Sequence, residues 1–469
     1  MNAAFRRFRQ TLALILTLTC GVVLSACHHS SSNAAATYYT VYVDVVGLAG
    51  AGLVLQNNGT NNLSVAANGE VSFSAQLVTG TTYNVSVLTE PTAPTQVCSV
   101  IQGTGLISGY NALVEVSCGT VGTALGRFTY VANRGSGTVS AYAINATTGA
   151  LTEVKGSPFP VPGAKQLYQV AIDPTGSYLY GVDVGGGHLY GAVINQNTGA
   201  LAAITGSPFA TGNKPVSLAF DYTGSYLYVA NFADNTISAY AVTIASGVLT
   251  PLAGSPFAVP GTTPGPRQIA VAGSFLFAAN ETAGTVAVFA VTPGTGVLTQ
   301  GVAGSPFATD SGPHSLAIGS ATSSTAVLYT ANAGSGNAGS ISAFTVDLAT
   351  GILSPVAGNP QPIPVVNNVA VDPKAKYLFV TETAGISVYP IVNLATGLLG
   401  TPVAGSPFAT GTNPYSLVTD VDDQFAYVGN DGSGSVSQFT FSTTTGILTP
   451  VAGAPLVLAG ANPDYLQIQ

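Results

Sequence analysis

The stretch that decides the fold is PVSLAFDYTGSYLYVAN at residues 215–231, followed by ISAY at 237–240 and GSPF at 254–257. Short apolar and aromatic runs alternate with turn residues in it, which is typical of strands joined by tight turns. Pro cannot donate to a strand ladder, so the GSPF turn suits a link between sheets. We expect four strands in this unit: Val216–Phe220, Tyr226–Ala230, Thr236–Val242 and Val248–Leu252.

The unit recurs seven times, and three markers keep the same register. GSPF or a degenerate copy begins at Gly156, Gly206, Gly254, Gly304, Gly358, Gly405 and Gly453, at spacings of 47 to 54 residues. Variants of YVAN end at Asn133, Asp183, Asn231, Asn280, Asn332, Glu382 and Asn430. Variants of TGxL have their Gly at Gly149, Gly199, Gly247, Gly296, Gly351, Gly397 and Gly446. Such a period, filled only with strand signals, predicts an all-β fold, a seven-bladed β-propeller over residues 127–469.

The two ends of the repeat region complement each other. It begins at Arg127–Tyr130, whose sequence resembles the second strand of a repeat, with no first strand before it. It ends at Pro463–Ile468, whose sequence resembles the first strand of a repeat, with no further strands after it. We therefore predict that the C-terminal strand completes the first blade. Such closure would cover sheet edges that otherwise template aggregation.

Residues 38–120 form a separate region whose text alternates at period two, as in Tyr39–Val45. This alternation and the turn pairs Asn58-Gly59 and Asn68-Gly69 predict a small β-sandwich with Asn-Gly hairpin turns. We find no chemistry in this region and interpret it as a spacer or adhesion module.

The N-terminal residues 1–26 have the order of a secretory signal peptide, with three Arg before an apolar run and small residues at its end. The alternative, a transmembrane anchor, needs about 20 apolar residues, and the run is shorter. Leu24-Ser25-Ala26-Cys27 resembles the lipobox of bacterial lipoproteins, and this resemblance implies that Cys27 is lipidated and becomes the mature N-terminus. His28 at the sorting position implies the outer membrane, and residues 27–37 are predicted to be a flexible tether.

Two cysteines remain in the predicted mature chain, Cys98 and Cys118. An exported protein folds in an oxidising compartment, so we predict that they form a disulfide. Two Cys without a nearby His are too few for a structural zinc site.

Composition excludes several classes of protein. The chain has 469 residues, 46% hydrophobic and only 6% charged, which argues against disorder. All 19 acidic residues but only eight of the 11 basic ones follow residue 26, so the predicted mature net charge is −11. Nucleic acid is therefore not expected as a partner, because phosphate binding needs clustered Lys and Arg.

The first strand of each propeller blade lines the central channel, so one position near its start gives a ring of seven residues at one mouth. Convergent polar groups at a concave mouth are the default candidate site. His314 is a candidate general acid or base, Arg267 a candidate carboxylate or enolate binder, and Asp464 would orient either. The alternative is that these side chains are only solvated at a wet entrance. The complete ring is Tyr168, Val216, Arg267, His314, Asn367, Tyr415 and Asp464.

The blade text at 215–231, with ISAY and TGxL after it, resembles the seven-bladed lactonase family, which includes propeller-type 6-phosphogluconolactonase and carboxymuconate cyclase. It is also similar to the Tyr-Val-Thr-Asn repeats of microbial surface proteins, which are binding or structural. The family's channel His follows a Pro, as His314 follows Pro313, so the lactonase resemblance implies a catalytic role for His314 and for Arg267. Gly319-Ser320-Ala321 stands where the family has Asp-Pro-x-Gly.

Two hypotheses of function follow. The first is a lipoprotein, anchored to the cell envelope by its lipid, that presents the propeller to a protein or a glycan. The second is an exported lactonase-like hydrolase or isomerase that acts on a small lactone or carboxylate, with Tyr168, Asn367 and Tyr415 as binding residues beside the catalytic candidates. In both we expect a monomer without cofactor or metal.

Overall fold

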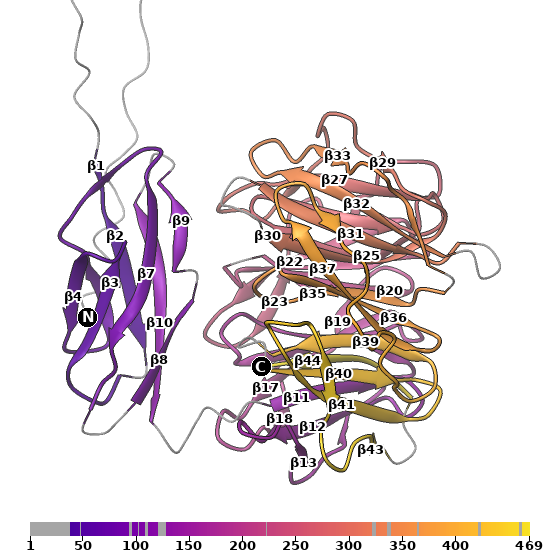
Figure 1. The fold of residues 1–469 in the computed structure, drawn as a ribbon, viewed down its shortest axis with the longest axis horizontal. Helices are drawn as coiled ribbons and strands as arrows, with labels where there is room; N and C mark the ends of the chain where they lie inside the picture. The colour runs from indigo at the N-terminus through magenta and orange to yellow at the C-terminus, as the bar shows by residue number, and fades with distance from the viewer. Residues whose placement is uncertain are drawn as a thin grey trace, which may run out of the picture.

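The computed structural model describes residues 38–46, 48–92, 96–101, 103–107, 111–120, 128–221, 223–320, 325–334, 339–363, 365–420, 424–458 and 462–469. All regular structure in this part of the chain is β-strand, as predicted (Figure 1). None of it contains a helix long and apolar enough to cross a membrane. The predicted signal peptide, Cys27 and the tether lie outside the described residues.

The N-terminal region consists of two four-stranded sheets and a two-stranded one. One sheet has the order β5-β2-β10-β8, the other β4-β3-β7-β9, and β1 pairs with β6. Alternate residues of β2 and β3 are fully buried between the sheets, as the period-two text predicts. The strands are β1 (Tyr38–Tyr39), β2 (Val41–Val46), β3 (Leu53–Asn57), β4 (Asn61–Val65), β5 (Gly69–Ser72), β6 (Leu77–Val78), β7 (Thr82–Thr89), β8 (Gln96–Ile101), β9 (Thr104–Leu106) and β10 (Ala112–Thr120).

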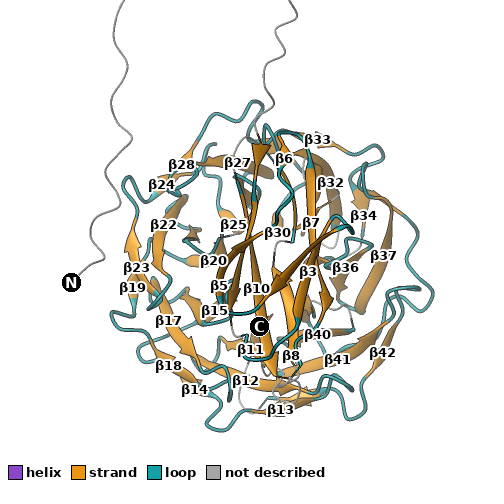
Figure 2. Ribbon diagram, turned by 90° about the vertical axis from the view of Figure 1, so that its left-hand side faces the viewer, coloured by secondary structure: helices purple, strands orange, loops and turns teal. Residues whose placement is uncertain are grey.

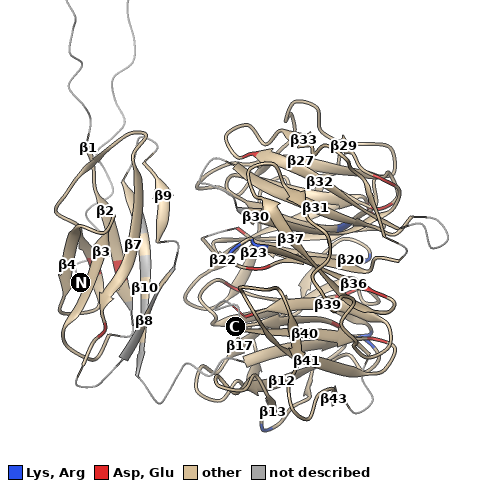
Figure 3. Cartoon of the chain, in the orientation of Figure 1, with Lys and Arg blue, Asp and Glu red and all other residues tan. Residues whose placement is uncertain are grey.

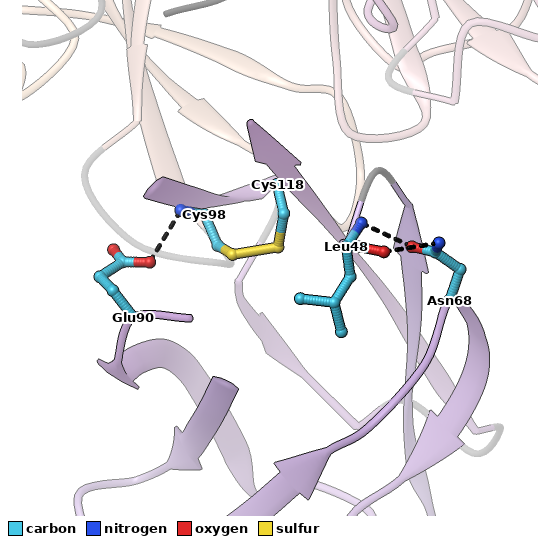
Figure 4. Close-up of a disulfide and its surroundings, with 5 residues drawn as sticks. All are labelled: Leu48, Asn68, Glu90, Cys98 and Cys118. Carbon is cyan, nitrogen blue, oxygen red and sulfur yellow. Dashed lines mark hydrogen bonds between the residues drawn. A yellow bond between two sulfur atoms is a disulfide. The ribbon is translucent and has the colours of Figure 1, made fainter. Parts of the chain in front are cut away.

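One of the two predicted hairpin turns is present and the other is wrong. Asn58 and Gly59 both have positive φ and join the antiparallel strands β3 and β4. Asn68-Gly69 instead connects β4 to β5, which belongs to the other sheet. There the Asn68 side chain accepts from Leu48 N at 2.7 Å and donates to Leu48 O at 3.0 Å (Figure 4). Asn68 therefore pins a neighbouring loop instead of shaping a hairpin.

The structure contains the disulfide between Cys98 and Cys118 (Figure 4). The two residues face each other directly in the antiparallel pair of β8 and β10. The backbone N–H of Cys98 also donates to a carboxylate oxygen of Glu90 at 2.8 Å. The bond thus staples two strands of one sheet at the edge of the sandwich core.

The C-terminal region is a ring of seven antiparallel sheets, the predicted blades (Figure 2). Blade 1 contains β11 (Phe128–Asn133), β12 (Thr138–Ile144), β13 (Leu151–Glu153) and β14 (Phe159–Pro160), and blade 2 contains β15 (Leu167–Ile172), β16 (Tyr178–Asp183), β17 (His188–Ile194), β18 (Leu201–Ala203) and β19 (Phe209–Ala210). Blade 3 contains β20 (Pro215–Phe220), β21 (Tyr226–Asn231), β22 (Thr236–Thr243), β23 (Val248–Pro251) and β24 (Phe257–Ala258), and blade 4 contains β25 (Pro266–Ala272), β26 (Phe275–Asn280), β27 (Thr285–Val291), β28 (Leu298–Thr299) and β29 (Phe307–Ala308). Blade 5 contains β30 (Pro313–Ser320), β31 (Thr325–Asn332), β32 (Ser340–Asp347), β33 (Leu353–Pro355) and β34 (Gln361–Pro362), blade 6 contains β35 (Asn368–Val371), β36 (Tyr377–Glu382), β37 (Gly385–Asn393) and β38 (Leu398–Leu399), and blade 7 contains β39 (Pro414–Thr419), β40 (Phe425–Asn430), β41 (Ser435–Phe441), β42 (Leu448–Pro450) and β43 (Leu456–Val457).

The GSPF turn does more than link blades. The residues after its Pro form a short further strand that returns to its own blade, as β24 does by pairing with β22. The Ser of the turn is also bound to its blade, since Ser255 Oγ accepts from Ala239 N at 2.9 Å. In blade 6 the same edge is reduced to a single bridge between Ile386 and Phe408. Each outer edge is therefore built from two pieces instead of the single fourth strand that we predicted.

The ring closes by strand exchange. The C-terminal strand β44 (Pro463–Ile468) pairs antiparallel with β11, so the first blade takes its innermost strand from the end of the chain. Leu466 of β44 is buried beside Val131 of β11 in the core that joins blades 7 and 1. The last residue adds contacts with blade 2, where Gln469 Nε2 donates to Gly176 O and to Gln196 Oε1, each at 2.7 Å.

Candidate functional site

A β-bulge lies near the start of most of the inner strands, at the positions predicted to form the ring. In five blades the register of the first and second strands shifts just after the first strand begins, so one first-strand residue lacks a partner across the ladder. Bulges re-aim side chains in this way, often next to functional sites. In β44 a similar shift spans Asp464 and Tyr465, and Asn367 directly precedes β35. The five bulged residues are Tyr168, Val216, Arg267, His314 and Tyr415.

Arg267 is the centre of an aromatic cluster drawn from several blades. One of its terminal nitrogens donates to Tyr168 Oη at 2.7 Å and to Tyr415 Oη at 3.0 Å, and the two hydroxyls contact each other. The guanidinium carbon lies 5.2 Å from the Tyr168 ring centre and 6.0 Å from that of Phe232, within the range of cation–π attraction. Tyr465 packs edge-on against both tyrosines. These contacts hold the guanidinium in place.

The charge balance of the cluster leaves Arg267 cationic. Burial alone would lower the pKa of Arg267, but Tyr168, Tyr415 and Glu281 raise it overall. Burial, together with Tyr465 and Tyr415, raises the pKa of the Tyr168 phenol well above its ordinary value, so this phenol stays neutral. The nearest acid is Glu281, whose Oε2 lies 3.6 Å from Arg267 Nε. That oxygen is buried and has no hydrogen-bond partner among the described residues.

His314 is held by the main chain of two neighbouring segments. Its Nε2 lies 2.7 Å from Asn367 O and its Nδ1 lies 3.3 Å from Gly312 O. Because both partners are acceptors, the shorter contact assigns the proton of the neutral ring to Nε2. Burial lowers the pKa of His314, and the carbonyl of Asn367 offsets only part of that effect. The imidazole is therefore neutral at pH 7, and both its nitrogens are directed at backbone carbonyls.

Asn367 and Val216 act as structural members of the ring. Asn367 accepts from His314 through its carbonyl and donates from its side-chain nitrogen to Pro414 O at 2.9 Å. Asn367 thus connects blades 5, 6 and 7. Val216 is buried in the core shared by blades 2, 3 and 4.

Asp464 lies against Arg134, and no hydrogen bond or ion pair with His314 or Arg267 is present among the described residues. Its Oδ2 is 3.1 Å from Arg134 Nε, and the side chain is only 1% exposed. Burial raises the pKa of Asp464 to about 7; Arg134 and Arg267 oppose this shift, and Asp431 adds to it. Desolvation thus outweighs the ion pair at this position.

The sequence-based prediction did not include the residues that contact Arg267 and Asp464 from the neighbouring loops. Glu281 and Phe232, which contact Arg267, and Arg134, which contacts Asp464, each directly follow the last residue of a YVAN marker. Asp431 occupies the same position in blade 7 and lies 3.8 Å from Arg134. The signal that could have found them is therefore a second ring, one residue beyond the marker. The only other polar member of that ring is Thr383.

The described residues contain no group of three or more His, Cys, Asp or Glu that could hold a metal ion. The described basic residues form no stripe, and charged side chains are sparse over both domains (Figure 3). What the mouth offers is one fixed guanidinium, aromatic rings, a carboxylate and a neutral imidazole. Such a set suits an oxygen-rich or carboxylated small molecule, or a sugar, better than a polyanion.

Fold and site together define a seven-bladed β-propeller with a polar channel mouth. Residues 124–263, which include the first three blades, match the family model described as Lactonase, 7-bladed beta-propeller. The predicted resemblance to the lactonase family is confirmed there, and the family-model match supports the predicted fold class. None of the curated proteins compared matches the chain.

Solved structures share the fold at low sequence identity. A putative 6-phosphogluconolactonase from Bacteroides fragilis is 18% identical, covers 75% of this chain and all of its own, and has a TM-score of 0.62. A similar protein from Bacteroides uniformis is 18% identical, with coverage of 73% and 99% and a TM-score of 0.61. A periplasmic gluconolactonase from Pseudomonas aeruginosa is 17% identical, with coverage of 73% and 98% and a TM-score of 0.57. At these identities the likeness establishes the fold alone.

Proposed function

We propose that the chain is an envelope-anchored lipoprotein whose lactonase-like propeller works as a binding module. The lipobox-like sequence at Leu24–Cys27 supports a lipid anchor on Cys27, and the disulfide supports folding in an oxidising compartment. The partner is a protein or a glycan that reaches the channel mouth, and the chain acts as a monomer at the outer membrane.

The observation that carries this proposal is that each candidate catalytic side chain is already held by the protein. Arg267 is bound by two phenols and faces Glu281, and Asp464 is paired with Arg134. Both nitrogens of His314 are directed at backbone carbonyls. A general base needs a lone pair within hydrogen-bond reach of the proton that it takes, and this arrangement offers none toward the channel. The cluster instead provides a rigid aromatic and cationic surface, which suits recognition.

A second function, lactone hydrolysis or lactonising isomerisation, is favoured by one specific observation. Glu281 Oε2 is buried without a hydrogen-bond partner among the described residues, beside a fixed Arg267 and near a neutral His314. A shared fold with a periplasmic gluconolactonase adds support. In hydrolysis, water would attack the lactone carbonyl, Arg267 would stabilise the oxyanion, and the ring C–O bond would break. His314 would have to turn Nδ1 away from Gly312 to accept the proton of the water, and it would then pass that proton to the leaving ring oxygen, which becomes a hydroxyl group of the opened acid.

One experiment separates the two functions. The purified mature protein is assayed against a panel of unphosphorylated sugar lactones and muconolactone-type compounds, together with His314→Ala and the matched control His188→Ala, which changes a histidine in β17 outside the ring. Turnover that His314→Ala abolishes and His188→Ala retains would establish the enzyme and refute the binding-only proposal. No turnover, together with capture of a defined envelope protein or glycan that Tyr415→Ala weakens, would support the binding module.

The anchor is tested separately. Cys27→Ser should move the protein from the detergent-extracted membrane fraction to the soluble envelope fraction, and the mass of a lipid-modified N-terminus should disappear. Cys20→Ser lies inside the predicted signal and serves as the matched control, with no change expected. A wild-type chain without lipid on Cys27 would refute the anchor.

A further inference from the structure

Blade 2 lacks a buried ring that the other six blades have. The YVAN marker in the second strand of each blade begins with an aromatic residue. The residue just before that aromatic pairs with one residue of the third strand. Six blades have an aromatic side chain there, at most 6% exposed. In blade 2 the residue is Ala192, and it is only half-buried. The six rings are Tyr142, Tyr240, Phe289, Phe344, Tyr389 and Phe439.

These rings pack on the preceding blade. Tyr142 of blade 1 clusters with Phe425 and Tyr427 of blade 7, and Phe439 of blade 7 clusters with Tyr377 and Phe379 of blade 6. Ala192 should therefore leave space between blades 1 and 2. A cavity of about 310 Å³ lies there, and its lining includes Val139, Phe159, Pro160, Leu179, Tyr190 and Ala192.

Residues near Ala192 line the cavity without filling it. Tyr190 replaces a Ser or Ala of the other blades two positions before Ala192 and forms one wall. The second residue of the YVAN marker is Val131 in blade 1 but Gly181 in blade 2. Gly181 also lines the cavity. Pro160 and Ala203 at its boundary are exposed, so a small molecule can enter from the outer rim of the ring. None of the seven channel-ring residues lines the cavity.

The neighbouring blades show what the space is shaped to hold. In blade 3 the hydroxyl of Tyr240, the counterpart of Ala192, donates to the carbonyl of Ala210 in blade 2. Ala258 is the residue of blade 3 that corresponds to Ala210 of blade 2. Its carbonyl accepts a hydrogen bond from Gln300 of blade 4 at 2.7 Å. Pro160 holds that position in blade 1, with the same pairing to the third strand. The missing group is therefore an aromatic ring whose hydroxyl reaches the Pro160 carbonyl.

We infer that the cavity between blades 1 and 2 is a binding site for a small phenol, whose ring takes the place of the absent aromatic side chain and whose hydroxyl donates to Pro160 O. Apolar cavities of about 150 Å³ already bind benzene, so this space accommodates a ring with a substituent. The site is independent of the channel mouth and of the function proposed for it.

The test is calorimetric titration of the mature protein with p-cresol and with toluene, which differs only in lacking the hydroxyl. We expect one molecule of p-cresol per chain, with a dissociation constant on the order of 0.1 to 1 mM. We expect toluene to bind about fivefold more weakly, because it cannot make the hydrogen bond. Ala192→Phe rebuilds the ring of the other blades and should lower p-cresol affinity at least ~10-fold, while the melting temperature stays at or above that of the wild type.

Matched variants keep the result interpretable. Val193→Phe adds the same ring on the opposite, exposed face of β17 and should leave p-cresol binding unchanged. Tyr240→Ala recreates the vacancy in blade 3 and should raise the stoichiometry to two. No binding of p-cresol at millimolar concentration, or equal binding by folded Ala192→Phe, would overturn the site. Equal affinity for toluene would overturn the role of Pro160 O.

Discussion

Tyr228 of blade 3 donates a hydrogen bond to the carbonyl of Gly296 in blade 4 at 2.8 Å, so the aromatic residue of the YVAN marker is tied to the TGxL marker of the next blade. The same bond joins four further pairs, and it is missing where blades 4 and 6 have Phe in place of Tyr. Two of the three sequence markers thus repeat because together they make one contact between blades. The other pairs are Tyr130 with Gly199, Tyr180 with Gly247, Tyr329 with Gly397 and Tyr427 with Gly149.

Removing one of these hydroxyls should weaken the propeller measurably. Tyr228 is fully buried, so Tyr228→Phe leaves the buried carbonyl of Gly296 without its donor. We expect the free energy of unfolding of the propeller to fall by about 1 to 3 kcal/mol. Guanidinium unfolding followed by tyrosine fluorescence measures the change.

The reverse substitution is the control. Phe277→Tyr in blade 4 places a hydroxyl at the position that lacks one and should stabilise the ring or leave it unchanged. Equal midpoints for wild type and Tyr228→Phe would show that water or a rearranged neighbour satisfies Gly296, which would contradict the assigned role of the bond.

The fold was predictable because its information is local and repeated. The strand bounds predicted for blade 3 agree with β20 to β23 to within one residue at each end, since each strand is flanked by turn residues with their own conformational demands. The short strand β24 was missed because two residues carry no periodicity. The hairpin turn predicted at Asn68-Gly69 was wrong because an Asn-Gly pair also suits a loop whose Asn side chain binds a distant backbone.

The candidate site was predictable only in part. One alignment position identified Arg267, Tyr168 and Tyr415, which do contact one another, because the same bulge recurs in their strands. Which partner each side chain selects depends on distances across the channel, and these are set by the whole ring. Asp464 therefore joins Arg134 instead of His314, and Glu281 escaped notice since only one position per blade was considered.

The disulfide should stabilise the N-terminal sandwich and not the propeller. Cys98 and Cys118 close a loop of 20 residues, for which chain entropy predicts about 3 kcal/mol. In the variant with both residues changed to Ser, the sandwich should melt earlier while the propeller transition stays in place. Calorimetry resolves the two transitions. Two free thiols in wild-type protein taken from the cell envelope would refute the bond itself.

The buried carboxyl of Asp464 should make the ring less stable as pH rises. Its folded pKa, about 7, lies above the ordinary value of 3.8, so the folded state binds the proton more tightly. The contribution to stability is therefore complete below about pH 4 and is lost as pH rises to 7, at no more than about 1.4 kcal/mol per pH unit.

Asp464→Asn removes the contribution of this carboxyl to the pH dependence of stability, so comparison with the wild type measures that contribution. The variant should lose less stability than the wild type between pH 5 and pH 8, and Arg134, which is 41% exposed, tolerates the loss of its partner. Burial lowers the pKa of His314, so His314 has the opposite sign and destabilises the fold as pH falls below its ordinary 6.5. Identical pH profiles of denaturation midpoints for wild type and Asp464→Asn would contradict the shift assigned to Asp464.

Deleting residues 462–469 should destabilise the whole ring, because the deletion removes β44 and leaves the edge of β11 without its partner. The loss includes the buried Leu466 and its pairing with Val131. An open ring also exposes a strand edge that templates association. We expect a clear fall in the melting temperature of the propeller and early proteolysis in blade 1. Deleting Gln469 alone removes the bonds to Gly176 and Gln196 but keeps β44, so it should cost far less. An unchanged melting temperature after the longer deletion would show that the ring does not depend on its closing strand.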